Sequence, residues 1–248
     1  RVMLRLDSRP AFFKHWFALN ALGLSVVPVN PDLRAAELEF MAAHASPCLA
    51  VATGQGFQDL QRASFKSGIE FPVIVPDEPL PAPASVTPVA DVRVEPLRRE
   101  SAMLYTSGTT GQPKGCVLAN LYFLNMGRWY NEAGGLCSLS DDEERMITPL
   151  PMFHMNALVC SLMAMVMAGG CLIALDRFHP QSWWASVRES GATCLHYLGV
   201  MLSILMKAPA SASDLDHQVR FGFGAGVDPG LHTEFENRIG FPLIEAGA

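Results

Sequence analysis

The sequence predicts an α/β protein built of layered, largely parallel β-sheets with helices on both faces. Short apolar runs alternate with segments of helical periodicity along the chain, which is the order of elements in parallel βαβ units. Of the 248 residues, 50% are hydrophobic and only 17% are charged, so the chain can bury a large core.

The first 75 residues show this alternation clearly. The helical pattern that starts at Pro10 stops before Gly23, and these are the usual positions of proline and glycine at the two ends of a helix. Strands are predicted at 2–6, 25–29, 48–52 and 71–75, and helices at 10–22, 34–44 and 55–66.

A proline-rich connector occupies residues 76–99. Six prolines fall between positions 76 and 96, and the segment has no hydrophobic periodicity. This composition predicts an extended connection, which could separate two lobes or form a long surface loop inside one domain.

Beyond the connector, strands are predicted at 101–105, 145–150, 171–175 and 193–197, with further strands before 224 and from 242. Another apolar segment covers 116–119, and helices are predicted at 120–132, 155–168, 178–190, 198–207 and 231–238. Small residues at 209–216 predict a loop. We interpret the four acidic residues at 141–144 as a solvated turn rather than a metal site.

Charge and cysteine content limit the classes of partner. The net charge is −6 and no Lys/Arg-rich cluster occurs, which argues against nucleic acid and anionic membrane surfaces as partners. None of the six cysteines forms a C-x-x-C pair, and most lie in apolar runs. We therefore expect reduced core thiols, a cytoplasmic location and no zinc site.

One long uncharged segment, residues 155–175, has the length of a membrane span. Gly169 and Gly170 interrupt it, and glycines at such a position predict a helix end or turn. We therefore interpret the segment as a buried helix followed by a buried strand.

The most informative stretch is Tyr105-Thr-Ser-Gly-Thr-Thr-Gly-Gln-Pro-Lys-Gly115, which follows an apolar strand. Glycines allow close approach of the backbone to phosphate oxygens, hydroxyl groups add neutral donors, and Lys114 adds a mobile positive charge. The spacing differs from the P-loop pattern G-x-x-x-x-G-K-[ST], because Gly115 stands where that pattern has Ser or Thr.

This stretch resembles the phosphate-binding loop of the adenylate-forming, AMP-binding superfamily, which includes the acyl-CoA synthetases. The resemblance implies that Thr106, Ser107, Thr109 and Thr110 hold the β- and γ-phosphates of ATP. It implies that Gly108 and Gly111 let the backbone approach the phosphates, and that Lys114 is both a cofactor-binding and a catalytic residue.

A second motif, Leu150-Pro-Met-Phe-His154, resembles the L-P-M-F-H form found in hydroxycinnamate-type CoA ligases. A histidine at a strand-to-helix junction would project from the carboxyl edge of a parallel sheet, where α/β proteins bind ligands. By resemblance, His154 lies near the substrate carboxylate and the α-phosphate, where it donates a hydrogen bond or acts as a gate.

A third motif follows the strand before position 224. Its glycines would let a flat ring lie against the backbone, and it resembles the family segment that packs against adenine and the acyl group. The implied cofactor-binding residues are Gly224, Ala225 and Gly226, together with Glu245 near the end of the chain.

The resemblance implies the fold of the large N-terminal domain of acyl-CoA synthetases. Residues 1–248 would form one incomplete domain that contains the 76–99 connector, and the small C-terminal domain with its catalytic lysine would be absent. We therefore expect the chain to be a fragment of a longer enzyme.

The implied reaction is the ATP- and Mg²⁺-dependent activation of a small-molecule carboxylic acid to an acyl-adenylate, followed by thioester formation with coenzyme A. Such an acid–thiol ligase would serve fatty acid or related metabolism. Two alternatives stay open: an adenylation domain that loads a carrier-protein thiol, and a non-catalytic nucleotide-binding fragment. The sequence specifies neither the acid nor the oligomeric state.

Overall fold

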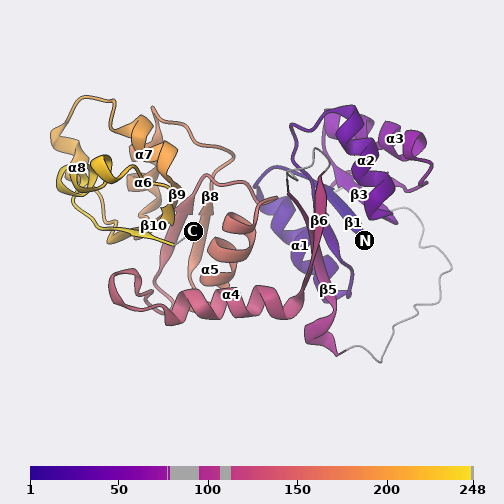
Figure 1. Ribbon diagram of the computed structural model, residues 1–248, viewed down its shortest axis with the longest axis horizontal. Helices are drawn as coiled ribbons and strands as arrows, with labels where there is room; N and C mark the ends of the chain where they lie inside the picture. The colour runs from indigo at the N-terminus through magenta and orange to yellow at the C-terminus, as the bar shows by residue number, and fades with distance from the viewer. Residues whose placement is uncertain (77, 79–94, 107–112, 247–248) are drawn as a thin grey trace. The chain divides into compact units, whose positions relative to one another are not determined.

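The computed structural model describes residues 1–76, 78, 95–106 and 113–246. The chain divides into two compact units, Arg1–Tyr122 and Phe123–Ala248, each with its own β-sheet (Figure 1). The division falls three residues into helix α4 (Asn120–Glu132). It does not fall in the proline-rich connector, which was the candidate boundary in the sequence.

The first unit holds a six-stranded sheet in the order β4-β3-β1-β2-β5-β6. Neighbouring strands from β4 to β5 run parallel, and β6 pairs antiparallel with β5 at the edge of the sheet. The elements are β1 (Val2–Arg5), α1 (Pro10–Ala21), β2 (Val26–Pro28), α2 (Ala35–Ala45), β3 (Leu49–Ala52), α3 (Gln55–Ser67), β4 (Val73–Ile74), the 3₁₀ turn η1 (Pro96–Arg98), β5 (Glu100–Thr106) and β6 (Lys114–Ala119).

Helices cover both faces of this first sheet, as the sequence predicts. The step from β1 to β2 moves to one side of β1, whereas the steps from β2 to β3 and from β3 to β4 move to the other side. Right-handed crossovers therefore place α1 on one face and both α2 and α3 on the opposite face. On the second of these faces, Leu38 and Leu60 pack in one buried cluster with Met3 of β1.

The second unit contains a five-stranded sheet in the order β11-β10-β9-β7-β8, with parallel pairing throughout. All strands of a parallel sheet end at the same edge. The elements after α4 are η2 (Gly135–Cys137), β7 (Arg145–Thr148), the π-helical segment η3 (Asn156–Ser161), α5 (Leu162–Ala168), β8 (Cys171–Ala174), α6 (Trp183–Ser190), β9 (Cys194–Leu198), α7 (Gly199–Leu205), η4 (Ala212–Leu215), β10 (Phe221–Ala225), α8 (Pro229–Ile239) and β11 (Leu243–Glu245).

Aromatic packing fixes α4 against the second sheet. The buried ring of Tyr130 lies 4.5 Å, centroid to centroid, from the ring of Phe223 on β10. Both belong to a cluster that includes Met146 of β7 and Met165 of α5. Strand β10 carries the third sequence motif, so this core holds the strand that leads to that motif in a fixed position.

The uncharged segment at 155–175 folds into a largely buried helix and a strand, but the prediction that the strand is buried is wrong: in β8, Cys171 is exposed and residues 172–174 are half-buried. The helix begins with the π-helical turn η3, continues as α5, and ends at Gly169, whose φ of +67° is the left-handed conformation that terminates helices. Among the described residues, no helix combines the length and the apolar character needed to cross a membrane.

The interpretation of residues 141–144 as a solvated turn is wrong for one residue. Three of the acids are exposed, but Glu144 is buried, with a relative exposure of 1%. Its carboxylate forms an ion pair with Arg220, accepts a hydrogen bond from the Thr193 hydroxyl, and accepts another from the Ser140 N–H at 2.8 Å. These donors replace the water that the carboxylate loses.

One predicted loop contains a short helical turn, and one expectation, about the cysteines, needs correction. The predicted loop at 209–216 contains the 3₁₀ turn η4, and Arg238 pairs with the buried Asp214 at 2.6 Å, so the segment is tied to α8. All six cysteines are free thiols, as expected, but half of them are surface residues rather than core residues. The exposed thiols are Cys48, Cys116 and Cys171.

Candidate functional site

The phosphate loop predicted from the sequence lies between two strands of the first unit. Thr106, the last residue of β5, pairs with Lys114, the first residue of β6, so the two ends of the motif lie side by side. Both side chains are exposed. Ser107, Gly108, Thr109, Thr110 and Gly111 lie outside the described residues, and their predicted roles stay predictions.

Helix α2 supports the base of this hairpin. His44 Nδ1 lies 2.7 Å from the Tyr105 hydroxyl, and the two rings meet edge to face with centroids 5.7 Å apart. Burial raises the pKa of Tyr105 to about 12, so its hydroxyl stays protonated. The residue before Thr106 is thus anchored to a neighbouring element.

His154 lies at the strand-to-helix junction that the sequence predicts. Strand β7 ends at Thr148, a turn follows in which the His154 N–H donates to the Pro151 carbonyl at 3.1 Å, and the π-helical turn η3 begins two residues later. The ring of Phe153 packs beside the imidazole with centroids 4.6 Å apart. Desolvation lowers the pKa of His154, although its side chain keeps access to solvent, so the imidazole is neutral at physiological pH.

Two polar residues near this junction were missed in the sequence. His196 on β9 and Ser161 at the end of η3 are both buried, and His196 Nδ1 lies 2.5 Å from Ser161 Oγ. Burial lowers the pKa of His196 to about 4. The sequence signal that could have revealed His196 is a histidine inside an otherwise apolar strand. Ser161 has no such signal in the sequence, but it lies in a π-helical turn, and such turns are often found at functional sites.

The third motif forms a tight turn at the end of β10. Gly226 follows the strand with a φ of +78°, which is the left-handed region that favours glycine. A Cβ atom on Gly224 would lie 2.4 Å from the Tyr197 carbonyl oxygen, and one on Gly199 would lie 1.7 Å from the Gly226 carbonyl oxygen. The backbone of β9, α7 and this turn therefore approach so closely that only glycines fit.

Glu245 supports this turn from the neighbouring strand. Its Oε1 atom accepts a hydrogen bond from the Val227 N–H at 2.7 Å, directly after Gly226. Glu245 is the last residue of β11, which pairs with β10. The carboxylate thus contacts the backbone of the motif, a contact that sequence reasoning did not foresee.

The predicted site residues are distributed between the two units. Thr106 and Lys114 belong to the first unit, where β5 ends at the same edge as the other parallel strands. The second unit contains His154, the turn from Gly224 to Gly226, and Glu245. These follow or end β7, β10 and β11, so the second unit gathers them at the carboxyl edge of one parallel sheet, where ligands bind in α/β proteins.

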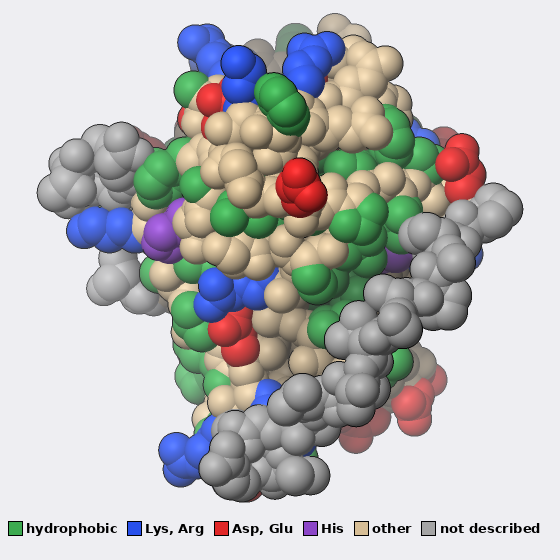
Figure 2. Space-filling view, turned by 90° about the vertical axis from the view of Figure 1, so that its right-hand side faces the viewer, with side chains coloured by type: hydrophobic (Ala, Val, Ile, Leu, Met, Phe, Trp, Pro, Cys, Tyr) green, Lys and Arg blue, Asp and Glu red, His purple; other side chains and the backbone are tan. Residues whose placement is uncertain are grey.

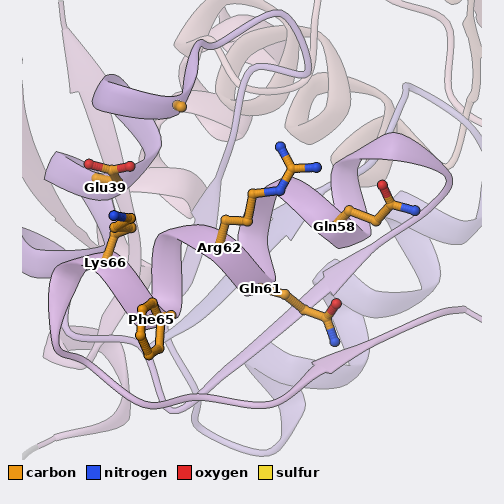
Figure 3. A pocket seen from close by; sticks show the side chains of 7 residues that line it. Glu39, Gln58, Gln61, Arg62, Phe65 and Lys66 are labelled. Atoms are coloured by element: carbon orange, nitrogen blue, oxygen red, sulfur yellow. The ribbon is translucent and has the colours of Figure 1, made fainter.

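The first unit has a surface pocket of about 480 Å³ between α2 and α3, shown in Figure 3. None of the predicted site residues lines it. Arg62, one of its basic residues, lies 3.9 Å from Asp59, which offsets its charge. The pocket is lined by Ala35, Glu39, Gln58, Gln61, Arg62, Phe65 and Lys66, and we do not assign it to the candidate site.

Surface charge on the visible described residues is mixed. Figure 2 shows one face of the molecule, on which basic, acidic and apolar side chains lie interspersed. Nucleic acid binding uses extended basic patches or stripes, and this face does not present one among its described residues.

The fold and these motifs together define an α/β protein whose parallel strands carry loop and turn motifs at their carboxyl ends. The family model described as "AMP-binding enzyme" matches residues 1–247. The chain therefore belongs to the family of AMP-binding enzymes, which confirms the resemblance.

Named relatives agree with this assignment. A crotonobetaine/carnitine–CoA ligase of Shigella flexneri serotype 5b is 28% identical over 232 residues, which cover 89% of this chain and 45% of the relative. The chain thus spans a little under half the length of this relative.

Solved structures show the same fold. The inhibitor-bound N-terminal domain of FACL13 from Mycobacterium tuberculosis aligns with a TM-score of 0.82 and 23% identity, covering 100% of this chain and 62% of that one. ATP-bound MatB from Rhodopseudomonas palustris aligns with a TM-score of 0.80 and 20% identity, covering 99% of this chain and 48% of that one. The predicted fold class, that of an acyl-CoA synthetase N-terminal domain, is confirmed.

Proposed function

We propose that this chain is the nucleotide- and carboxylate-binding part of an acyl-CoA ligase. In the proposed reaction, a carboxylate oxygen attacks the α-phosphorus of ATP and pyrophosphate leaves, giving an acyl-adenylate. The sulfur of coenzyme A then attacks the acyl carbon, AMP leaves, and a thioester forms. The observation that carries the proposal is the placement of His154 and the Gly224–Gly226 turn at one edge of a parallel sheet in an AMP-binding family member.

Lys114 would neutralise negative charge on the phosphates. Its ammonium group stands at the end of a hairpin whose other end is Thr106, so a charge and a hydroxyl donor flank the phosphate motif. Transfer at phosphorus depends chiefly on positioning and on charge stabilisation, which suits these groups. Ser107, Thr109 and Thr110 would add hydroxyl donors, and Gly108 and Gly111 would permit close backbone approach.

His154 would act on the reacting carboxylate. A neutral imidazole donates one hydrogen bond and keeps one acceptor nitrogen, so it can orient a carboxylate or an α-phosphate oxygen without adding a full positive charge. Its lowered pKa supports this neutral form. The adjacent Phe153 ring would restrict how the imidazole turns.

The Gly224–Gly226 turn would receive the adenine and the acyl group. Ala225 is the only residue of the three with a side chain, so the backbone there can lie against a flat ring. We revise the expected role of Glu245: its carboxylate would hold the turn through Val227 rather than contact the nucleotide itself.

Mg²⁺ would be held through the nucleotide rather than at a separate protein site. No group of three histidine, cysteine, aspartate or glutamate side chains among them is arranged to hold a metal ion. Mg²⁺ usually binds through substrate phosphates, waters and one or two carboxylates. We therefore propose that Mg²⁺ arrives with ATP, where it would supply further charge neutralisation.

Coenzyme A as the acceptor is supported by the relative named crotonobetaine/carnitine–CoA ligase. Free thiols at all six cysteines are compatible with a reducing compartment, and we propose the cytoplasm as the location. A small carboxylic acid, as in fatty acid metabolism, would be the substrate.

Carboxylate-dependent exchange of labelled pyrophosphate into ATP tests the first half-reaction in the intact protein. We expect exchange with some members of a panel of short, branched, aromatic and long-chain acids, and none without acid. Thioester formation with free coenzyme A, compared with a phosphopantetheinylated carrier protein, then identifies the acceptor. ATP binding without exchange for any acid would instead support a non-catalytic nucleotide-binding module.

A further inference from the structure

His196 is a buried polar residue for which the proposed reaction has no use. It lies in the middle of β9, with 3% relative exposure, between the strands that lead to His154 and to the Gly224–Gly226 turn. Its cross-strand partner on β10 is Phe223, and the two rings meet edge to face with centroids 5.5 Å apart. Phe223 directly precedes Gly224.

One arrangement of protons satisfies the side-chain contacts of His196. Ser161 Oγ lies 2.5 Å from His196 Nδ1 and 3.3 Å from the Asn156 carbonyl oxygen. A serine hydroxyl has one proton, and a carbonyl can only accept. The hydroxyl therefore donates to Asn156, and Nδ1–H of a neutral imidazole donates to the hydroxyl. Ser161 thus connects the first residue of η3 to the strand β9.

His196 also holds the other end of the segment that carries His154. The Thr148 hydroxyl donates to the His196 carbonyl oxygen at 3.3 Å, and the same hydroxyl accepts from the Leu150 N–H at 3.2 Å. Residues 148–150 precede His154, and residues 156–161 follow it. The backbone and side chain of one residue therefore bracket the segment from both sides.

We infer that His196 and Ser161 are positioning residues that fix the His154 segment relative to the Gly224–Gly226 turn. The inference rests on the proposed function, in which both parts contact the reactants. His196 contacts the His154 segment through its backbone carbonyl, which accepts from Thr148, and through its ring, which bonds to Ser161. Its ring also packs against Phe223, which precedes the Gly224–Gly226 turn. A misplacement of about 1 Å at a reacting group can cost on the order of 100-fold in rate, so such an anchor has a direct effect on catalysis.

A purely structural role would give a different result. A buried His–Ser pair that only filled the core would affect stability, and its removal would leave the surroundings of His154 and the balance between kcat and KM unchanged. A positioning role requires that removal of the hydrogen bond change the solvation of His154.

The test compares three variants with one control. Ser161→Ala removes the bridging hydroxyl, His196→Leu removes the ring donor, and His196→Asn keeps an N–H group near the position of Nδ1. Ser64→Ala is the matched control, because Ser64 is also a buried serine, with bonds to the Ile69 carbonyl at 2.9 Å and the Phe71 N–H at 3.0 Å in the first unit.

The first readout is the titration of the histidine rings by NMR in the intact protein, with the His154 signal assigned by His154→Gln. We expect Ser161→Ala and His196→Leu to raise the pKa of His154 toward the ordinary value of about 6.5, while Ser64→Ala does not change it. The second readout is pyrophosphate exchange by the intact protein. We expect kcat to fall about 10- to 100-fold with KM for ATP nearly unchanged, and His196→Asn to recover most of the loss.

An unchanged His154 titration in both Ser161→Ala and His196→Leu would overturn the inference, as would an equal loss of kcat in Ser64→Ala. If His196→Leu does not fold, Ser161→Ala decides the question, since it removes a single hydroxyl group. Failure of the proposed function is distinguishable, because wild-type protein would then show no exchange while the NMR titration still reports on the anchor.

Discussion

Arg220, immediately before β10, forms an ion pair with Glu144, immediately before β7, and the Glu144 carboxylate is completely buried. Thr193, immediately before β9, donates to the same carboxylate. All three residues precede their strands, so this cluster lies at the amino edge of the second sheet. The candidate site occupies the opposite, carboxyl edge, and we therefore assign the Glu144 cluster to stability.

We expect Arg220→Ala to lower the free energy of unfolding by about 3 kcal/mol, because removal of one partner leaves a buried charge without its counter-ion. Urea unfolding at pH 7 measures the loss. The control is Arg177→Ala, because Arg177 forms an exposed pair with Asp176 at 3.7 Å and such pairs contribute under about 1 kcal/mol. Equal small losses in both variants would contradict the assignment.

The Glu144 cluster is a feature that the sequence alone could not predict. Strands and helices were predictable because local signals mark them: α1 begins at Pro10, and Gly169 ends α5. The burial of Glu144 has no such local signal, since its neighbours in sequence are solvated acids and its partner Arg220 is 76 positions away. Only the pairing of β7, β9 and β10 brings the donors to it.

The candidate site also has parts that local sequence signals predict and parts that they do not. The motifs around Lys114, His154 and Gly224 were predictable because each is a short run of characteristic residue types. The Ser161–His196 pair was not readable, because its members are 35 positions apart and a hydroxyl on a helix resembles any other polar residue. Likewise, Glu245 was singled out, but its contact with Val227 depends on the register between β10 and β11.

Glu245 offers a test of the turn that follows β10. We expect Glu245→Ala to weaken ATP binding about tenfold, because the Val227 N–H loses its acceptor and the Gly224–Gly226 turn loosens. Glu245→Gln keeps a carbonyl acceptor at the same place and should stay within about twofold of wild type. Isothermal titration with ATP gives both values.

Glu236→Ala is the matched control for this pair of variants. In the wild type, Glu236 Oε1 accepts a hydrogen bond from the Leu243 N–H at 2.8 Å. Leu243 is the first residue of β11, and Glu245 is the last. We expect a loss of stability without a change in ATP affinity. A similar loss of affinity in Glu236→Ala would show that Glu245 acts through strand β11 as a whole.

Lys114 should act on the reaction more than on binding. We expect Lys114→Ala to slow acyl-adenylate formation by roughly 100-fold or more, because charge builds up on the phosphates as pyrophosphate leaves. Binding of the carboxylic acid should change much less. Single-turnover adenylation and equilibrium binding of the acid, measured on the intact protein, separate the two effects. Equal losses in both would contradict a role at the phosphates, and Lys114→Arg shows whether charge alone suffices.

The pH dependence of stability should reveal His196. Burial lowers the pKa of its imidazole to about 4 in the folded protein, whereas an unfolded chain has the ordinary value of about 6.5. Between these values the unfolded chain binds a proton that the folded protein does not. The contribution of His196 to stability is therefore complete above pH 6.5 and is lost as the pH falls toward 4.

We expect wild type to lose about 2 kcal/mol more than His196→Asn between pH 7 and pH 5, because asparagine does not titrate. Urea unfolding of the two proteins at both pH values gives the difference, in which groups common to both cancel. His232→Asn is the control, because it makes the same substitution at a histidine on α8 that is not buried and keeps about a third of its side chain exposed. The same pH dependence in wild type and His196→Asn would mean that the buried imidazole accepts a proton in the folded state, in which case the Ser161 hydrogen bond must tolerate a charged ring.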